Sequence, residues 1–257
     1  MGEETAQKHS SLYAGTLAKG LKLLRAFDES HASLSLSELV QRTGLQKSAV
    51  QRLAHTLHVE GMLDRDSATR RFRPSHAWLE LAYAYYWSDP LIARALPKLV
   101  ELSQQIGETV NLAQMSGNHI IYALRLPSQR THFAASIVGR RVPALCTASG
   151  RVMLSTWAEE DRWQAVETWE VHPYTHKTIT DRDAINADIV ECRRNGYALT
   201  RDQVILNEIS LAAPITGPGG RSEAAVQVSV SGLSYDFDEV RARILPAVLD
   251  TANGILA

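Results

Sequence analysis

The chain has 257 residues, of which 45% are hydrophobic and 21% charged, and its formal net charge is −1 at pH 7. This is the composition of an ordinary folded protein with one large domain or two smaller ones. It excludes a membrane helix, which needs roughly 20 consecutive apolar residues, and the polar start MGEETAQKHSS lacks the apolar part of a secretion signal, so we expect a cytoplasmic protein with no membrane contact.

The first predicted element is an amphipathic helix. Leu17, Leu21, Leu24 and Phe27 recur at the spacing of one helix face, and the pattern ends within residues 28–31. These four apolar side chains are therefore expected to form the buried side of the helix.

The second predicted helix is specified by the residues at its ends. Ser35 and Glu38 have the spacing of a capping box, in which each side chain accepts a hydrogen bond from the backbone of the other. Leu34 and Leu39 occupy the two positions of a hydrophobic staple. We expect a helix that begins directly after Ser35 and ends at Gly44.

The third predicted helix has a buried stripe and a polar face. Val50, Leu53, Ala54 and Leu57 recur at helical spacing, and Gly61 marks the end of the helix. The opposite face carries Lys47, Ser48, Gln51, Arg52 and His55. The segment MLDRDSATRRFRPS that follows predicts two short strands joined by a polar turn at residues 66–69.

Two helices joined by a tight turn and followed by a hairpin form a winged helix-turn-helix domain. In this arrangement the second helix presents polar and cationic side chains to the major groove. Between Arg42 and Arg73 the chain has seven basic and three acidic residues, a local positive excess that suits an anionic partner. We therefore predict that this segment binds double-stranded DNA, although a solvated helix face is the alternative.

Individual contacts can be assigned by side-chain chemistry. Arg52 and Gln51 suit bidentate contacts to guanine and adenine, whereas Lys47 and Ser48 near the helix start suit phosphate. The predicted DNA-binding residues are Lys47, Ser48, Gln51, Arg52, His55, Arg70 and Arg71.

A linker helix is expected in the segment HAWLELAYAYYW, residues 76–87. Its apolar surface exceeds what so small a domain can cover, so part of it is expected to pack on another subunit. Asp89 and Pro90 then cap and start a further helix, which we expect to kink at Pro97 and to end at Gly107.

Beyond Gly107 strands and helices alternate. TVNLAQM and HIIYALRL read as strands, residues 147–157 and 180–195 as helices, and EISLAAPIT with EAAVQVSVSG as a hairpin around residues 217–220. Val226, Val228 and Val230 alternate with polar residues, so one face of the last strand is apolar and the other can form hydrogen bonds. A final helix over residues 240–252 is expected to cover the sheet.

Three segments of the chain resemble the IclR family of bacterial transcriptional regulators. They are SLSELVQRTGLQKSAVQRLAHTLHVEGML, RRVPALCTASGRVMLS, and GYALTRDQVILNEISLAAPI followed by AAVQVSVSG. The resemblance implies an α+β protein with a winged helix-turn-helix domain at residues 1–75, a linker helix at 76–88 and a GAF-like effector-binding domain at 89–257. It also implies a homodimer or homotetramer that binds operator DNA and needs no cofactor.

The chain departs from the family pattern at three positions. Gln203 and Asn207 stand where family members usually have an acidic residue and a glycine, and Ala49 replaces the usual threonine of the third helix. One DNA contact of the family is therefore expected to be absent.

The segment CTASGR places Thr147, Ala148 and Ser149 at a predicted helix start, where free backbone N–H groups can hold a carboxylate. The alternative is that Thr147 only caps the helix and the small residues allow close packing. By resemblance, the effector pocket would be lined by Thr147, Ala148, Ser149, Thr200, Asn207, Ser210, Ser229 and Ser231. The same segment is most similar to regulators of aromatic-acid catabolism, so the expected effector is a small aromatic carboxylate.

Four arginines can either pair with such a carboxylate or lie on the surface, namely Arg125, Arg130, Arg140 and Arg141.

No metal site is predicted, because Pro173 opposes a helix between His172 and His176, and Cys146 and Cys192 lack metal-ligand spacing. The chain has no nucleophile elbow, phosphate loop or HExxH motif. Because no such motif supports it, an enzyme on the GAF-like domain with a vestigial DNA-binding head is kept only as the alternative hypothesis.

Overall fold

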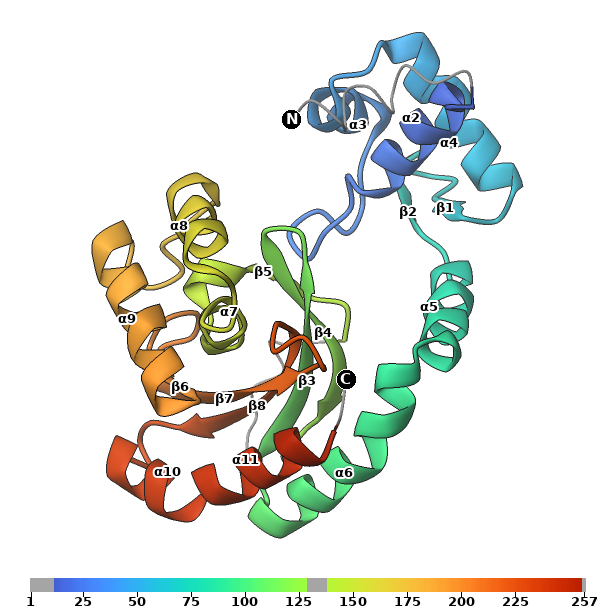
Figure 1. Cartoon of the computed structure of the whole chain (residues 1–257). Coiled ribbons are helices and arrows are strands. Elements are labelled where there is room, and N and C mark those ends of the chain that lie inside the picture. Colours follow the sequence, from blue (N-terminus) through green and yellow to red (C-terminus); the bar gives the residue numbers. More distant parts are fainter. Residues whose placement is uncertain (1–11, 129–137, 256–257) are drawn as a thin grey trace. The chain divides into compact units, whose positions relative to one another are not determined.

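The computed structural model describes residues 12–128 and 138–255, so Arg130 lies outside the described residues. The chain divides into two compact units between Tyr85 and Tyr86 (Figure 1). Its helices and antiparallel strands confirm an α+β fold. Of the helices within the described ranges, none combines the length and the apolar character that crossing a membrane requires.

The first unit contains the predicted helices and hairpin. Its elements are α2 (Gly15–Leu24), α3 (Leu36–Thr43), α4 (Lys47–Val59), β1 (Leu63–Arg65), β2 (Phe72–Pro74) and most of α5 (Ala77–Ser88). Strands β1 and β2 pair antiparallel, and Leu34 adds a bridge to Phe72. Both residues belong to a core to which each of α2, α3 and α4 contributes.

Helix α2 differs from the predicted helix in its length and in its buried face. It ends at Leu24, and Leu17 and Leu21 are 63% and 43% exposed. The buried residues are Gly20 and Leu23 instead. Gly20 faces Leu53 of α4, which would lie at an ordinary contact distance of 3.9 Å from an added Cβ, so the packing of α2 on α4 buries this face in place of the leucine face.

Helix α3 confirms the predicted capping box. The Ser35 hydroxyl accepts from the Glu38 N–H at 3.3 Å, and the Glu38 carboxylate accepts from the Ser35 N–H at 2.7 Å. These hydrogen bonds to Ser35, with a further one from Arg71, lower the pKa of Glu38 to about 2. Leu34 and Leu39 are buried as a staple requires, and Gly44 ends the helix with a φ of +64°.

Helix α5 is the predicted linker helix. The Trp78 indole N–H donates to the Met62 carbonyl at 3.0 Å, and its ring packs edge-on against Phe27, with ring centroids 6.5 Å apart. The first turn of α5 is thus fixed to the first unit. Along the rest of the helix, large apolar side chains such as Leu79 and Tyr83 are exposed.

The second unit begins with α6 and contains a single large sheet. Its elements are α6 (Pro90–Ile106), β3 (Thr109–Ser116), β4 (His119–Leu126), β5 (Arg141–Pro143), the short 3-10 helix η1 (Ala144–Cys146), α7 (Ala148–Leu154), α8 (Glu159–Thr168), α9 (Arg182–Asn195), β6 (Ala198–Arg201), β7 (Glu208–Thr216), β8 (Ser222–Ser231), α10 (Phe237–Arg243) and α11 (Leu245–Gly254). Asp89 and Gly107 cap α6 as predicted. Strands β5 and β6 and helix α8 go beyond the predicted elements, and the final helix is interrupted at Ile244.

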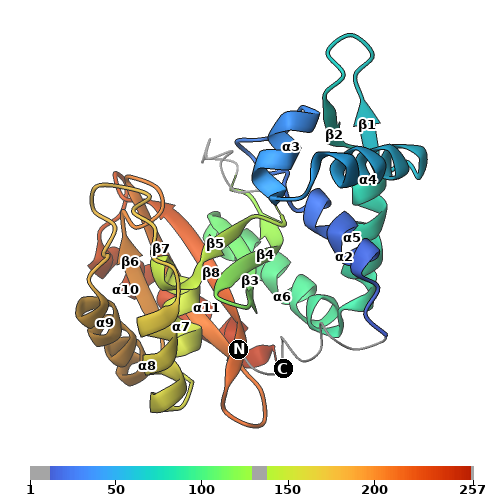
Figure 2. The ribbon, with the colours of Figure 1, turned by 90° about the horizontal axis from the view of Figure 1, so that it is seen from above.

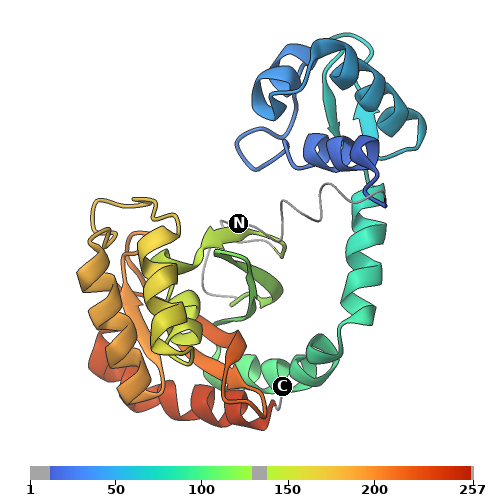
Figure 3. The same cartoon turned by 45° about the horizontal axis from the view of Figure 1, so that its top comes forward.

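The sheet is antiparallel, in the order β5-β4-β3-β8-β7-β6. Helices α6, α10 and α11 cover one face, and α7, α8 and α9 lie on the other (Figure 1, Figure 3). Val226, Val228 and Val230 point into the core under the first three helices. Gln227 and Ser229 therefore point to the face that carries α7, as the predicted alternation requires.

Small residues allow α7 to lie close to the sheet. Ala113, Ala212 and Ala225 of three strands share one buried cluster with α7. At Gly150 the backbone of α7 meets the preceding turn so closely that an added Cβ would lie 2.1 Å from the Ala144 carbonyl oxygen. Since this partner is a backbone atom, the position requires glycine.

We predict that Gly150→Ala destabilises the second unit by about 3 kcal/mol, because the new Cβ can be accommodated only by moving η1 away from α7. Urea unfolding followed by tryptophan fluorescence measures this. Gly219→Ala is the matched control, since no atom lies within 4 Å of its Cβ position. Equal unfolding midpoints for the two variants would contradict the prediction.

Candidate functional site

The polar face of α4 is exposed over its whole length. On the opposite side Val50 and Ala54 are fully buried in the core of the first unit. The exposed side chains are Lys47, Ser48, Gln51, Arg52 and His55. At the helix start Gln46 forms no side-chain cap, which leaves the first backbone N–H groups available to an anion.

The hairpin of the first unit has a defined turn. The Asp66 carboxylate accepts from the backbone N–H groups of Ala68 and Thr69 at 3.0 and 2.6 Å. The Thr69 backbone bond is the main cause of a lowered pKa for Asp66. The hairpin projects beyond α3 and α4 (Figure 2), so its turn is accessible together with the polar face of α4.

The two predicted arginines of the hairpin differ in their surroundings. Arg70 is exposed and has a φ of +60°. Arg71 turns back toward α3, where Nη2 donates to the Ser33 carbonyl at 2.7 Å and pairs with Glu38 at 2.9 Å. Arg71 therefore braces the hairpin against α3, whereas Arg70 is exposed.

The second unit has a cavity between the sheet and the η1–α7 segment. Its empty space is about 480 Å³ counted out to the mouth, but the part that admits water-sized molecules is only about 20 Å³, room for about one water. It is lined by Asn111, Tyr122, Arg140, Val142, Cys146, Thr147, Ala148, Ser149, Thr200, Gln203, Val204, Ile205, Glu208, Ser210, Gln227 and Ser229. The lining includes six of the eight pocket residues expected from the sequence.

Asn207 and Ser231 lie outside this lining, in contrast to the expectation. Asn207 has a φ of +60°, its N–H donates to Asp202 Oδ1 at 2.6 Å, and its carbonyl accepts from the Gly232 N–H at 2.7 Å. The Ser231 hydroxyl accepts from the Leu233 N–H at 3.3 Å. Both residues thus close turns at the end of the sheet.

The hydroxyls of Thr147 and Ser149 have different roles. Thr147 Oγ1 accepts from the Gly150 N–H at 2.9 Å and donates to the Ala144 carbonyl at 3.1 Å, so it caps α7. Ser149 Oγ is buried and has no hydrogen-bond partner among the described residues. A buried polar group without a partner costs about 1–3 kcal/mol, so this hydroxyl is a candidate for a ligand contact.

The strand register brings polar residues of neighbouring strands together on the sheet wall. Asn111 lies opposite Gln227 of β8 and opposite Arg125 of β4. Arg125 Nη1 donates to Asn111 Oδ1 at 3.2 Å, and Asn111 Nδ2 donates to Gln227 Oε1. Gln227 Nε2 in turn donates to the hydroxyls of Ser229 and Ser210, at 2.8 and 3.1 Å. These hydrogen bonds all point from the guanidinium toward the serines.

Glu208 follows this row of side chains. Ser210 Oγ donates to Glu208 Oε1 at 2.8 Å. Burial raises the pKa of the Glu208 carboxyl, and it outweighs the opposing effect of the serine hydrogen bonds and of the charges of Arg125 and Arg140. Burial also raises the pKa of Tyr122 in the same cavity. The cavity lining therefore combines the half-buried carboxyl of Glu208, the phenol of Tyr122 and the guanidinium of Arg140.

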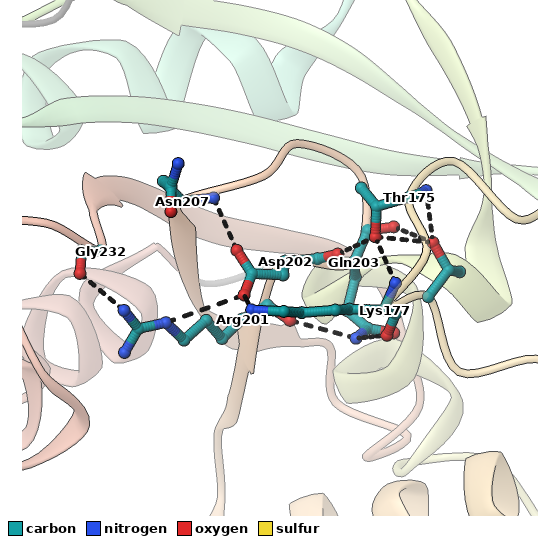
Figure 4. A network of polar contacts seen from close by, with 8 residues as sticks. Thr175, Lys177, Arg201, Asp202, Gln203, Asn207 and Gly232 are labelled. Atoms are coloured by element: carbon teal, nitrogen blue, oxygen red, sulfur yellow. Dashed lines mark hydrogen bonds and ion pairs between the residues drawn. The ribbon is translucent and has the colours of Figure 1, made fainter.

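A second polar network lies beside the cavity (Figure 4). The Asp202 carboxylate accepts from Lys177 Nζ at 2.7 Å and from the Asn207 N–H at 2.6 Å, and these bonds lower its pKa. Gln203 Nε2 donates to the carbonyls of Lys177 and Arg201, both at 3.1 Å. Since Gln203 also lines the cavity, this network fixes part of the cavity wall.

Arg151 connects α7 to this wall. Its side chain is 1% exposed, and Nε donates to the Leu145 carbonyl at 2.9 Å. Nη1 pairs with Asp188 of α9 at 2.7 Å, and Nη2 donates to Gln203 Oε1 at 3.1 Å. One buried guanidinium therefore holds together α7, α9 and the Gln203 loop.

Several lining residues were not singled out by the sequence. Asn111 and Gln227 occupy polar positions of strands in which apolar residues alternate, the same signal that singled out Ser229. Glu208 and Tyr122 carry no comparable signal. Arg140, which the sequence left as either a counter-ion or a surface residue, lines the cavity. In the two described ranges, no group of three or more His, Cys, Asp or Glu side chains is placed to hold a metal ion.

Comparison with known proteins gives two family matches. Residues 16–67 match the IclR helix-turn-helix domain, and residues 83–257 match the C-terminal domain of the bacterial transcriptional regulator IclR. A Pca regulon regulatory protein from Pseudomonas putida is 30% identical over 241 residues, which cover 93% of this chain and 82% of that protein.

Solved structures share the fold. An IclR transcriptional regulator from Alicyclobacillus acidocaldarius superimposes with a TM-score of 0.83 at 20% identity, covering 94% of this chain and 97% of that one. An IclR homologue from Microbacterium hydrocarbonoxydans, solved in complex with 4-hydroxybenzoate, gives a TM-score of 0.74 at 21% identity, covering 93% and 97%.

We predict that Asp188→Ala lowers the free energy of unfolding by about 2–3 kcal/mol, because it leaves the buried Arg151 charge without its carboxylate partner. Asp238→Ala is the control, since Asp238 forms an exposed ion pair with Arg241 that contributes less than about 1 kcal/mol. Chemical unfolding of both variants tests the difference. A small and equal loss in the two would show that Arg151 is stabilised without Asp188.

Proposed function

The chain belongs to the IclR family of bacterial transcriptional regulators, and we propose that it is a regulator whose second unit binds a small organic carboxylate that changes the affinity of the first unit for operator DNA. The relatives are transcriptional regulators, so the enzyme hypothesis is set aside. The observation that carries the proposal is the cavity with the buried hydroxyl of Ser149, for which the described part of the chain offers no hydrogen-bond partner.

DNA binding is assigned to the polar face of α4 and to the hairpin. The face offers a guanidinium, an amide and a short hydroxyl within two helical turns, a set that can form hydrogen bonds to base edges and phosphates. The hairpin contributes the exposed Arg70, whereas we assign Arg71 a bracing role in place of a direct contact. Ala49 offers only a methyl group at this surface.

The cavity supports a carboxylate effector. The Ser149 hydroxyl can donate to a carboxylate oxygen, and Arg140 supplies a positive charge in the same lining. The remaining expected residues that line it, Thr147, Ala148, Thr200, Ser210 and Ser229, have small side chains. A fold relative from Microbacterium was solved with 4-hydroxybenzoate, and together with the Pca regulon relative this favours an aromatic acid.

We infer that the working form is a homodimer or homotetramer. The exposed apolar side chains of α5 form a surface that a second subunit would cover. Two winged helices related by a two-fold axis would bind two half-sites of an operator. The effector can shift DNA affinity only through its different affinities for the two arrangements, typically about 1–3 kcal/mol.

Gel-shift titration on the DNA upstream of the protein's own gene tests the DNA-binding part. Affinity should fall steeply as salt rises from 50 to 200 mM, because phosphate contacts release counter-ions. Adding an aromatic acid should shift the titration curve. A curve that does not respond to salt would oppose the proposal.

We predict that Arg52→Ala weakens binding to the specific site by about 1–3 kcal/mol and relaxes sequence preference at one position, because Arg52 is assigned to a base edge. Arg194→Ala, an exposed arginine of α9 in the other unit, serves as the control. Footprinting and gel shifts at fixed salt measure both effects. An unchanged affinity and footprint would show that Arg52 does not contact a base.

We predict that Ser149→Ala weakens carboxylate binding about tenfold and leaves the ligand-free protein equally or more stable, because the variant removes a buried hydroxyl that lacks a partner. Calorimetry with benzoate and thermal unfolding without ligand measure the two effects. Ser155→Ala is the control, since that buried hydroxyl donates to the Val152 carbonyl. If the Ser149→Ala variant keeps the wild-type affinity, the carboxylate of the ligand binds to a group other than Ser149.

A further inference from the structure

The hydrogen bonds on the sheet wall of the cavity end at a carboxylate. Gln227 donates to Ser210 at 3.1 Å, and Ser210 donates to Oε1 of Glu208 at 2.8 Å. An ionised carboxylate has about four acceptor positions and no donor. Glu208 therefore retains acceptor capacity toward the cavity that it lines.

The direction of the hydrogen bonds defines what this wall can bind. Arg125 donates to Asn111, Asn111 to Gln227, and Gln227 to both serines, so the amide donors of the row are directed at protein acceptors. What the end of the row offers to an occupant is the acceptor of Glu208. A half-buried acceptor that lines the cavity favours an occupant that brings a hydrogen-bond donor.

Charge restricts the donor to a neutral group. The guanidinium groups of Arg125 and Arg140 lie close enough to interact electrostatically with Glu208, so an ammonium group here would meet two positive charges. A second carboxylate here would face the carboxyl of Glu208. A hydroxyl group meets neither repulsion and can donate directly to the carboxylate.

The polar group to which the carboxylate is assigned belongs to a different wall. Ser149, to which the carboxylate is assigned, lies on α7, whereas Glu208 lies at the start of β7 in the sheet. A ligand that contacts both walls would therefore present its carboxylate to α7 and a second polar group to the sheet. Tyr122 and Val142, which also line the cavity, supply apolar surface to such a ligand.

We propose that Glu208 accepts a hydrogen bond from a hydroxyl group of the effector, so that the pocket selects hydroxylated carboxylic acids over the same acids without the hydroxyl. This inference rests on the proposed function, because it takes the carboxylate to be held in this cavity. It names the second polar group of the effector and the residue that recognises it.

Calorimetry on the full-length protein with matched acids tests the inference. The probes are benzoate, the three hydroxybenzoates, 4-methoxybenzoate, and the aliphatic pair hexanoate and 6-hydroxyhexanoate. We expect at least one hydroxylated acid to bind about tenfold or more tightly than its parent acid, because a site built for a hydroxyl is left with an unpaired polar group by the analogue. If that acid is 4-hydroxybenzoate, the methoxy analogue should lose the gain, since it can accept but not donate.

Variants connect the preference to Glu208. In Glu208→Leu the ratio of affinities for the preferred acid and its parent should fall to within about twofold, because the acceptor is gone. Glu208→Gln keeps the shape and an acceptor oxygen but loses the charge, so it should show an intermediate ratio and it replaces the leucine variant if that one does not fold. Glu167→Leu changes an exposed glutamate of α8 and should keep the wild-type ratio.

The outcomes separate this inference from the proposed function. If no acid of either kind binds the wild-type protein, the carboxylate pocket itself is wrong and the inference falls with it. If parent and hydroxylated acids bind equally well, the pocket stands and the hydroxyl-binding role of Glu208 is overturned. A folded Glu208→Leu protein with the wild-type preference would likewise overturn the assignment to Glu208.

Discussion

The close contact between helix α7 and the sheet determines the shape of the cavity. The small side chains of Ala113, Ala212 and Ala225 let α7 pack close to the strands, and Gly150 lets the preceding turn approach the helix backbone. Packing this tight leaves no room for a large side chain on either surface. Polar residues of the sheet and of α7 line the cavity beside this contact.

Polar side chains can be buried at this place only because the strand register pairs them. Asn111 and Gln227 lie opposite each other; Asn111 Nδ2 donates to Gln227 Oε1, and Gln227 Nε2 donates onward to the serines. A shift of the register by one residue would turn these side chains into the apolar core on the opposite face. The same register that builds the core under α6 and α11 therefore also places the polar wall of the cavity.

The sequence predicted best those features whose cause is local. The capping box of Ser35, the glycine ends of helices and the hairpin around residues 217–220 depend on neighbouring residues, and each is present. Features that depend on packing between distant segments were predicted less well. The buried face of α2, with Gly20 and Leu23, follows from its packing on the other helices of the first unit, and Glu208 faces the cavity because of strand pairing, which a periodic pattern does not reveal.

The narrowness of the cavity bears on how a ligand can act. Space for about one water cannot hold a benzoate ring, so the walls must separate before an aromatic acid enters. The sheet wall is held by hydrogen-bonded ladders on both sides of β8 and by the continuous core beneath it. The opposite wall is held in part by Arg151, which joins α7 to Gln203 and to Asp188 of α9. If the walls separate at α7, the elements tied to Arg151 would move together with it. A ligand that binds the open arrangement more tightly shifts the population toward it. The size of the shift is limited by the difference in binding free energy between the two arrangements.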